Sequence, residues 1–324
     1  MYSRREFGVM MLAGLPLSVA LAKINSKFKG VQIGAITYSF RSIPASEIIP
    51  AMVKIGLSEA ELMSNHCEAL AGAPQATAFG VGRGPGGQGG QAASGGGRGQ
   101  VSPEQQEAQR LHQEALRNWR LATSSDTFKA VKKKFNDAGI DLQILCFNQR
   151  MTATDDDIEY AFQMAKALGV KAISSSSTVS FAKRIAPFAD KHKIRWGGHG
   201  HSNINDPDEF ATPQSFATIM SYSKYIGVNL DIGHFTAANF DPVAYIKEHH
   251  ARITNLHLKD RKKNQGANVP WGQGETPIKE VLQLMAKEKY AFPANIEFEY
   301  QVPEGSDLMT EMGKCVNYCK NTLA

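Results

Sequence analysis

Short apolar runs alternate with longer segments of helical periodicity from residue 31 to the end of the chain. This alternation is typical of a parallel α/β domain, in which each strand is followed by a helix that covers the sheet. We expect eight strands, at residues 31–38, 59–64, 142–147, 171–176, 194–199, 227–233, 255–260 and 294–300.

The segments between these runs carry helix start and stop signals. Three aspartates open a helix expected at 155–169, and Gly169 ends it. Thr276 is expected to cap a second helix, with Pro277 at its first position. Eight strands with intervening helices predict a single-domain (β/α)8 TIM barrel over residues 30–324. An open doubly wound sheet is the alternative, although no glycine-rich turn follows the first strand to bind a dinucleotide.

Residues 75–104 interrupt the alternation with a glycine-rich tract, which is followed by a polar helix expected at 104–118. Such a tract buries too little apolar surface to offset the entropy of ordering it. We expect a flexible insert within the barrel, on the active-site side, placed to cover the pocket or to contact a partner subunit. A phosphate-binding loop is disfavoured because the tract contains no Gly-Lys-Ser/Thr.

The first 22 residues have a different character. Arg4 and Arg5 precede Phe7, an apolar run and the small residues "ALA" at 20–22. This resembles a bacterial twin-arginine export signal. We expect a periplasmic or exported protein with no stable membrane association after cleavage. An uncleaved anchor or an ordinary helix is the alternative, but the apolar run is shorter than the ~20 residues that span a bilayer.

Composition narrows the classes of function. The chain has 324 residues, of which 42% are hydrophobic, and a formal net charge of +5. Its lysines are scattered rather than gathered with aromatic residues into a basic stripe, so nucleic acid is not an expected partner. The four cysteines lack zinc-ribbon spacing. Cys315 and Cys319 lie on one face of a helix, where two core thiols are favoured over a disulfide.

Ionisable residues close several of the expected strands. In a (β/α)8 barrel the active site lies at the carboxyl ends of the strands. Those ends carry Glu61, His66, Glu68, His199, His201, Asp231, His234, His257, Lys259, Asp260, Glu297 and Glu299. Each alone could cap a strand, and the two-residue spacing of His199 and His201 places both on one face whatever their role. Together they predict a mixed nitrogen and oxygen site for one divalent metal ion, Mn2+, Co2+, Zn2+ or Mg2+.

The stretches "AKALGVKAI", "GVNLDIGHF", "NLHLKDR" and "NIEFEY" resemble the sugar phosphate isomerase/epimerase superfamily of xylose isomerase-like TIM barrels. The resemblance runs from about residue 30 to the carboxyl terminus, apart from the insert. It implies a metal held by Glu, Asp, His and Glu from four successive strands. The last three are Asp231, His257 and Glu297 here. The position of the family's first glutamate is occupied by His199 in this chain. This residue departs from the pattern, and we take it as the remaining ligand.

The resemblance also suggests roles for other residues. We expect Glu297, Lys259 and His201 to be catalytic, and Glu61, His66, His234, Trp271 and Glu299 to contact the substrate. For Trp271, packing on the barrel rim is an equal alternative to stacking on a sugar. A metal-bound imidazole at His199 cannot serve as the second base of a two-base epimerase. One-base abstraction of an α-proton by a carboxylate or by Lys259, giving an enediolate, is therefore expected.

Three functions remain open from the sequence. The first is a metal-dependent isomerase or epimerase acting on a non-phosphorylated carbohydrate, because an exported enzyme seldom meets sugar phosphates. The second is a lyase or hydratase that cleaves keto-glycosides or keto-sugars by β-elimination. The third is an exported sugar-binding protein without activity. A DNA-directed nuclease of the endonuclease IV type is disfavoured, and a homo-oligomer is left open.

Overall fold

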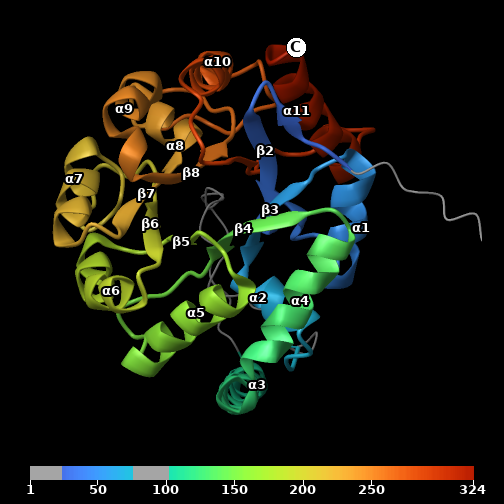
Figure 1. Ribbon diagram of the computed structural model, residues 1–324, viewed down its shortest axis with the longest axis vertical. Coiled ribbons are helices and arrows are strands. Elements are labelled where there is room, and N and C mark those ends of the chain that lie inside the picture. Colours follow the sequence, from blue (N-terminus) through green and yellow to red (C-terminus); the bar gives the residue numbers. More distant parts are fainter. Residues whose placement is uncertain (1–23, 76–101) are drawn as a thin grey trace, which may run out of the picture.

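Eight parallel strands close into a barrel in the computed structural model, which describes residues 24–75 and 102–324 (Figure 1). The strands are β2 (Val31–Ile36), β3 (Glu59–Met63), β4 (Asp141–Cys146), β5 (Ala172–Ser175), β6 (Arg195–His199), β7 (Ile226–Asp231), β8 (Ile253–Leu258) and β9 (Ala294–Ile296). Each strand pairs with its sequence neighbours, and β9 pairs with β2. The expected closed barrel is confirmed over the open sheet. A short strand, β1 (Lys27–Phe28), adds antiparallel to β2.

Helices surround the barrel as an outer ring (Figure 1). They are α1 (Ala45–Ile55), α2 (Ser64–Leu70), α3 (Pro103–Ala122), α4 (Ser125–Asp137), α5 (Asp155–Leu168), α6 (Val179–His192), α7 (Pro213–Tyr222), α8 (Ile232–Ala237), α9 (Pro242–His249), α10 (Ile278–Glu288) and α11 (Leu308–Thr322), with 3-10 turns at Thr37–Phe40 and His250–Arg252. Apolar side chains between strands and helices form the core, with Trp196, Phe210 and Phe216 among the largest.

The helix signals are only partly realised. Thr154 and Asp157 form a capping box at the start of α5, and Gly169 ends that helix with φ 62°, as expected. The second predicted cap is wrong by one residue, because α10 begins after Pro277. The Thr276 hydroxyl instead accepts the backbone N–H of Arg261 at 3.0 Å, which commits it to the loop after β8.

Other sequence predictions have mixed outcomes. Cys315 and Cys319 are free, buried thiols rather than a disulfide. None of the helices in the described ranges combines the length and hydropathy needed to cross a bilayer. Residues 1–22 and nearly all of the insert lie outside the described residues. The polar helix after the insert is α3, which starts at Pro103 with a Ser102 and Gln105 capping box.

The barrel interior contains a chain of buried polar side chains. Asn295 donates to Glu59 at 2.6 Å, and Asn255 donates to both Asn295 and Glu61, at 3.3 and 2.8 Å. Space for this chain depends on Gly34, because a Cβ there would lie 1.6 Å from Oε2 of Glu59. The floor beneath the strand ends is thus hydrogen-bonded and fixed in position.

Candidate metal centre

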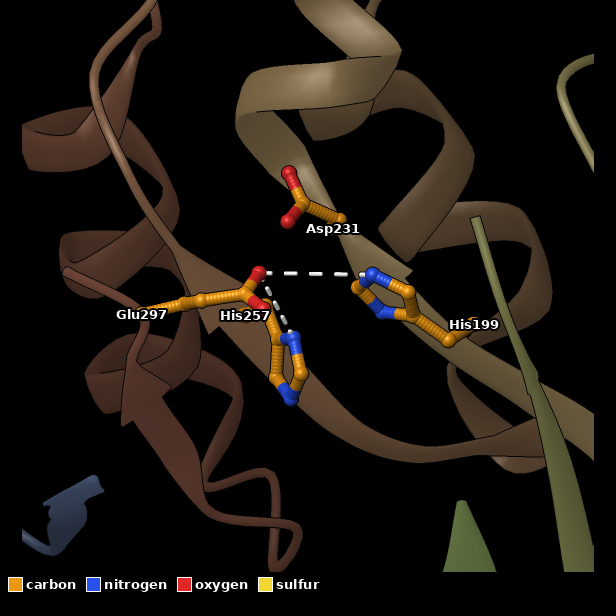
Figure 2. Close-up of side chains that lie close together, drawn as sticks. All are labelled: His199, Asp231, His257 and Glu297. Carbon is orange, nitrogen blue, oxygen red and sulfur yellow. Dashed lines mark hydrogen bonds and ion pairs between the residues drawn. The ribbon is translucent and has the colours of Figure 1, made fainter. Parts of the chain in front are cut away.

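Four side chains converge at the carboxyl ends of the last four strands (Figure 2). His199 and Asp231 end β6 and β7, His257 precedes the last residue of β8, and Glu297 follows β9 directly. Each offers one nitrogen or oxygen atom, and these four atoms lie within 4.8 Å of one another. All four residues are buried. They are the four that the sequence predicted as ligands.

The detailed contacts fit a metal site. Nδ1 of His257 lies 3.1 Å from Oε2 of Glu297, and Nε2 of His199 lies 4.0 Å from the same oxygen (Figure 2). Nδ1 of His199 is buried and has no hydrogen-bond partner among residues 24–75 and 102–324. Imidazole and carboxylate groups gathered without full hydrogen bonding are costly to bury unless a cation binds them. Two imidazoles and two carboxylates suit divalent transition metals.

Glu61 supports His257 from below. Its Oε2 lies 2.6 Å from Nε2 of His257, on the ring edge away from Glu297. An Nε2–H that donates to this carboxylate leaves the Nδ1 lone pair facing the metal centre, which is the usual arrangement for a metal-binding histidine. Asn255 and Ser174 donate to Glu61 in turn. Glu61 was expected to contact the substrate. It is completely buried and contacts the candidate metal ligand His257 instead.

Lys259 is surrounded by carboxylates. Its Nζ lies 3.1 Å from Asp231, 2.8 Å from Glu297 and 2.5 Å from Glu299. Burial acts to lower the pKa of Lys259, but these three carboxylates outweigh it and raise the pKa above its ordinary value. The side chain is therefore an ammonium ion that neutralises carboxylates. This environment is unfavourable for the role of base that was one option for Lys259.

The carboxylates respond unequally to this environment. Burial raises the pKa of Asp231 to about 7, and Lys259 only partly opposes it. For Glu297 burial acts in the same direction, but Lys259 and His257 outweigh it and hold the pKa well below its ordinary value. Burial works to lower the pKa of His257, yet Glu61 and Glu297 raise it. Without a metal these shifts favour an ionised Glu297 beside a protonated His257, and a divalent cation would take the place of that proton.

A cavity opens beside the four ligands, and His201 forms part of its wall. Nδ1 of His201 makes a short hydrogen bond with Glu209, and Nε2 lies 3.0 Å from the hydroxyl of Ser176. When Nδ1–H donates to Glu209, Nε2 carries the lone pair on the cavity side. This histidine is therefore arranged to accept a proton from a molecule in the cavity.

His234 lines the same cavity between two cationic residues. Its Nε2 lies 3.1 Å from Nζ of Lys259, and its Nδ1 lies 2.5 Å from Nη1 of Arg261. Burial, with Lys259 and other neighbours adding to it, holds the pKa of His234 well below its ordinary value. It is a neutral ring at the cavity wall, where a substrate contact was expected, and Glu299 also lines this wall.

Two other expected substrate contacts lie elsewhere. Nδ1 of His66 lies 3.0 Å from the hydroxyl of Thr37, and His66 is not among the cavity-lining residues described. Trp271 packs edge-on against Tyr318 of α11, with ring centroids 5.6 Å apart, in a separate groove. Trp271 therefore packs on the barrel rim, which was the alternative to stacking on a sugar. Of the further strand-end residues, Glu68 pairs with Arg120, and Asp260 accepts backbone N–H groups of its own loop.

Several cavity residues were missed from the sequence. They are Tyr38, Asn148, Arg150 and Ser176 on the wall, with Glu209 and Arg261 behind it. Asn148 and Arg150 follow the expected strand 142–147, and Ser176 closes the strand 171–176. Collecting neutral and basic residues after every strand, rather than histidines and carboxylates alone, would have found these three. Glu209 lies ten residues beyond β6 and left no such signal.

Comparison with protein families gives one match, to a model described as a xylose isomerase-like TIM barrel, over residues 107–313. No curated protein matches the sequence. Among solved structures the chain is similar to a sugar phosphate isomerase/epimerase from Parabacteroides distasonis, with 17% identity and a TM-score of 0.56, covering 91% of this chain and 95% of that one.

Two further structures are similar in fold. A probable 3-DHS dehydratase, AsbF, from Bacillus anthracis has 14% identity and a TM-score of 0.59, covering 89% of this chain and 99% of that one. The IOLI protein with a bound zinc atom has 13% identity and a TM-score of 0.56, covering 90% and 96%. At these identities the likeness establishes the shared barrel and leaves the reaction undetermined.

Proposed function

Because the chain belongs to the xylose isomerase-like TIM barrel family, we propose that it is a divalent-metal-dependent isomerase or epimerase of a non-phosphorylated carbohydrate. The observation that carries this proposal is the convergence of His199, Asp231, His257 and Glu297 within 4.8 Å beside a cavity. A similar fold holds zinc in the IOLI protein and belongs to an isomerase/epimerase in Parabacteroides distasonis.

The four ligands would hold one Mn2+, Co2+, Zn2+ or Mg2+ ion. When bound, the ion supplies Lewis-acid polarisation of a substrate carbonyl or neighbouring hydroxyl, which acidifies the adjacent C–H. Glu61 holds the His257 ring in the tautomer that ligation needs. The Lys259 ammonium offsets carboxylate charge beside the place where negative charge develops in the substrate.

His201 is the proton-transfer residue in this proposal. Its Nε2 takes the proton from the carbon next to the carbonyl, and Glu209 stabilises the imidazolium that results. Return of that proton to the former carbonyl carbon, with transfer of the hydroxyl proton to the former carbonyl oxygen, gives the isomer. Glu297, at the metal centre, is the carboxylate available as a second proton carrier for epimerisation. His199, as a ligand, has no free role in proton transfer.

β-Elimination is the second candidate, and the imidazole at His199 favours it. Where a family member has a glutamate that is both ligand and base, this chain has an imidazole ligand, which leaves His201 as the better-placed base. Elimination needs one base, and the proton that His201 removes from carbon can pass to the leaving oxygen. A dehydratase with the same fold supports this alternative.

The choice of a non-phosphorylated substrate rests on export. The arginine pair and apolar run of residues 1–22 support the proposal that the protein leaves the cytoplasm by the twin-arginine route, and sugar phosphates are mainly cytoplasmic. That route carries folded cargo, which suits a protein that acquires its metal before export.

Metal content and turnover in D2O test the proposal. We expect about one divalent ion per chain in the wild type, and loss of metal in both His199→Ala and Glu297→Gln. Solvent deuterium on carbon in a rearranged ketose or aldose would support the isomerase. Release of an aglycone or water with an unsaturated sugar would support elimination instead. Full metal occupancy with sugar binding and no turnover would indicate a sugar-binding protein without activity.

A further inference from the structure

Arg150 is an exposed residue at the cavity wall, and its guanidinium group is unpaired among the described residues. It lies in the loop between β4 and α5 and lines the same cavity as His201 and Glu299. Its side chain makes no hydrogen bond, ion pair or ring contact with any residue in 24–75 or 102–324. The other two cations of the site differ, because Lys259 contacts three carboxylates and Arg261 donates to Ser202, His234 and Gly266.

The backbone that carries Arg150 is fixed on both sides. Before it, the carbonyl of Gln149 accepts the hydroxyl of Ser177 at 2.7 Å. After it, Arg184 of α6 donates to the carbonyls of Met151 and Ala153, at 3.2 and 2.5 Å. The neighbouring Asn148 side chain accepts the backbone N–H of Ser176 at 2.7 Å. The loop backbone is therefore tied to the residues after β5 and to α6, whereas the guanidinium group itself makes no contact with the described residues.

Arg150 and the β8 residues of the metal centre lie on opposite sides of the barrel. The strands are ordered β2 to β9 and closed by the β2 and β9 pair, so β4 lies across the barrel from β8. Arg150 follows β4, whereas His257 and Lys259 belong to β8 and the residue positions just beyond it. A substrate that contacted both the metal centre and Arg150 would therefore lie across the cavity.

We propose that Arg150 binds a carboxylate of the substrate, so that the carbohydrate processed here is a sugar acid with its anionic group remote from the reacting carbons. This inference rests on the proposed function, in which the reacting end of the substrate binds at the metal centre. A guanidinium offers two parallel N–H donors that match a carboxylate, and a single positive charge that a monoanion balances. The unpaired cation at the cavity supplies a counter-charge that no side chain in residues 24–75 or 102–324 uses.

Binding of three matched ketoses tests the proposal. D-Fructose, D-fructuronate and D-fructose 6-phosphate differ only at carbon 6, which carries a hydroxyl, a carboxylate or a phosphate. Dissociation constants are measured by calorimetry on metal-loaded protein. We expect fructuronate to bind at least about 10-fold more tightly than fructose, the range of a charge-assisted hydrogen bond. Arg150→Gln should abolish that preference, while Arg150→Lys keeps part of it.

Arg117→Gln is the matched control, because Arg117 is exposed on α3, a helix that contributes no residue to the described cavity wall. It should retain the wild-type preference. Equal affinity for fructose and fructuronate, or a preference that survives Arg150→Gln, overturns the inference and leaves the proposed function intact. If fructose 6-phosphate binds more tightly than fructuronate and this preference depends on Arg150, the residue binds a phosphate. That result overturns the proposal that the substrate is a sugar acid.

Gluconate, which has the carboxylate but no carbonyl, separates the two proposals. Arg150-dependent binding of gluconate without turnover of any ketose supports the carboxylate site and counts against the isomerase. If the metal-loaded protein binds neither gluconate nor fructuronate, the carboxylate site is refuted whatever the outcome with fructose.

Discussion

The carboxylate of Glu61 and the imidazole of His257 meet at 2.6 Å although they are 196 residues apart in the chain. One comes from β3 and the other from β8, and both are essentially free of solvent. The contact fixes which ring nitrogen of His257 faces Glu297. Glu61, which is not one of the four candidate ligands, thus sets the orientation of one of them.

Glu61→Gln should weaken metal binding by about 10-fold to 100-fold, because the amide removes the charge that orients and polarises the His257 ring. Competition against a chromophoric chelator measures the affinity. Glu59→Gln is the matched control. Burial and the neighbouring Glu61 raise the pKa of Glu59 well above its ordinary value, which favours the neutral carboxyl that Gln resembles. Equal losses in the two variants would indicate general damage to the barrel interior.

Glu209→Gln should reduce kcat by about a hundredfold while the metal content stays at the wild-type level. The carboxylate holds the Nδ1–H tautomer of His201 and stabilises its protonated form. Nitrogen chemical shifts of His201 report the tautomer directly. The adjacent Asp208 caps α6 through Ser180, so Asp208→Asn should keep full activity. A Glu209 variant with wild-type kcat would exclude His201 and Glu209 as the proton-transfer pair.

Lys259→Gln should lower the free energy of unfolding of the metal-free protein by about 3 kcal/mol or more, because it leaves buried carboxylates without their counter-charge. Divalent metal should recover part of this loss, since Asp231 and Glu297 then bind the ion. Urea denaturation with and without metal measures both effects. Lys133→Gln removes an exposed ion pair with Asp137 and should change stability little. A metal-free Lys259 variant as stable as wild type would contradict the electrostatic account.

Stability should fall on mild acidification because of His66. Thr37 accepts the backbone N–H of Met63 and directs its own hydroxyl proton to Nδ1 of His66, which needs that nitrogen unprotonated. Burial lowers the pKa of His66 from 6.5 to about 4. The unfolded chain therefore binds the proton first, and the stabilisation that is complete above pH 6.5 is lost as the pH falls towards 4.

The corresponding measurement compares wild type with His66→Gln in urea. Wild type should lose about 1 kcal/mol more than the variant between about pH 7.5 and about pH 5.5. Parallel pH profiles for the two proteins would show that His66 titrates alike in the folded and unfolded states.

The sequence by itself predicted the eight strands and the barrel, and the family resemblance singled out four candidate ligands among the ionisable residues at the strand ends. The strands and the barrel depend on local signals, which are apolar runs of strand length and helix periodicity between them. His199, Asp231, His257 and Glu297 all lie within one residue of a strand end, so chain order alone brings them to one edge of a parallel barrel.

Only the tertiary structure decided the roles of the remaining residues. Glu61 and His66 follow the same expected strand, yet one supports His257 across the barrel and the other bonds Thr37. Trp271 packs on α11 instead of the cavity, and Glu209 reaches His201 from a loop. Strand alternation specifies the face on which a side chain lies, whereas its partner depends on closure of the barrel and on loop paths. Those are contacts between segments far apart in the sequence, which no local pattern records.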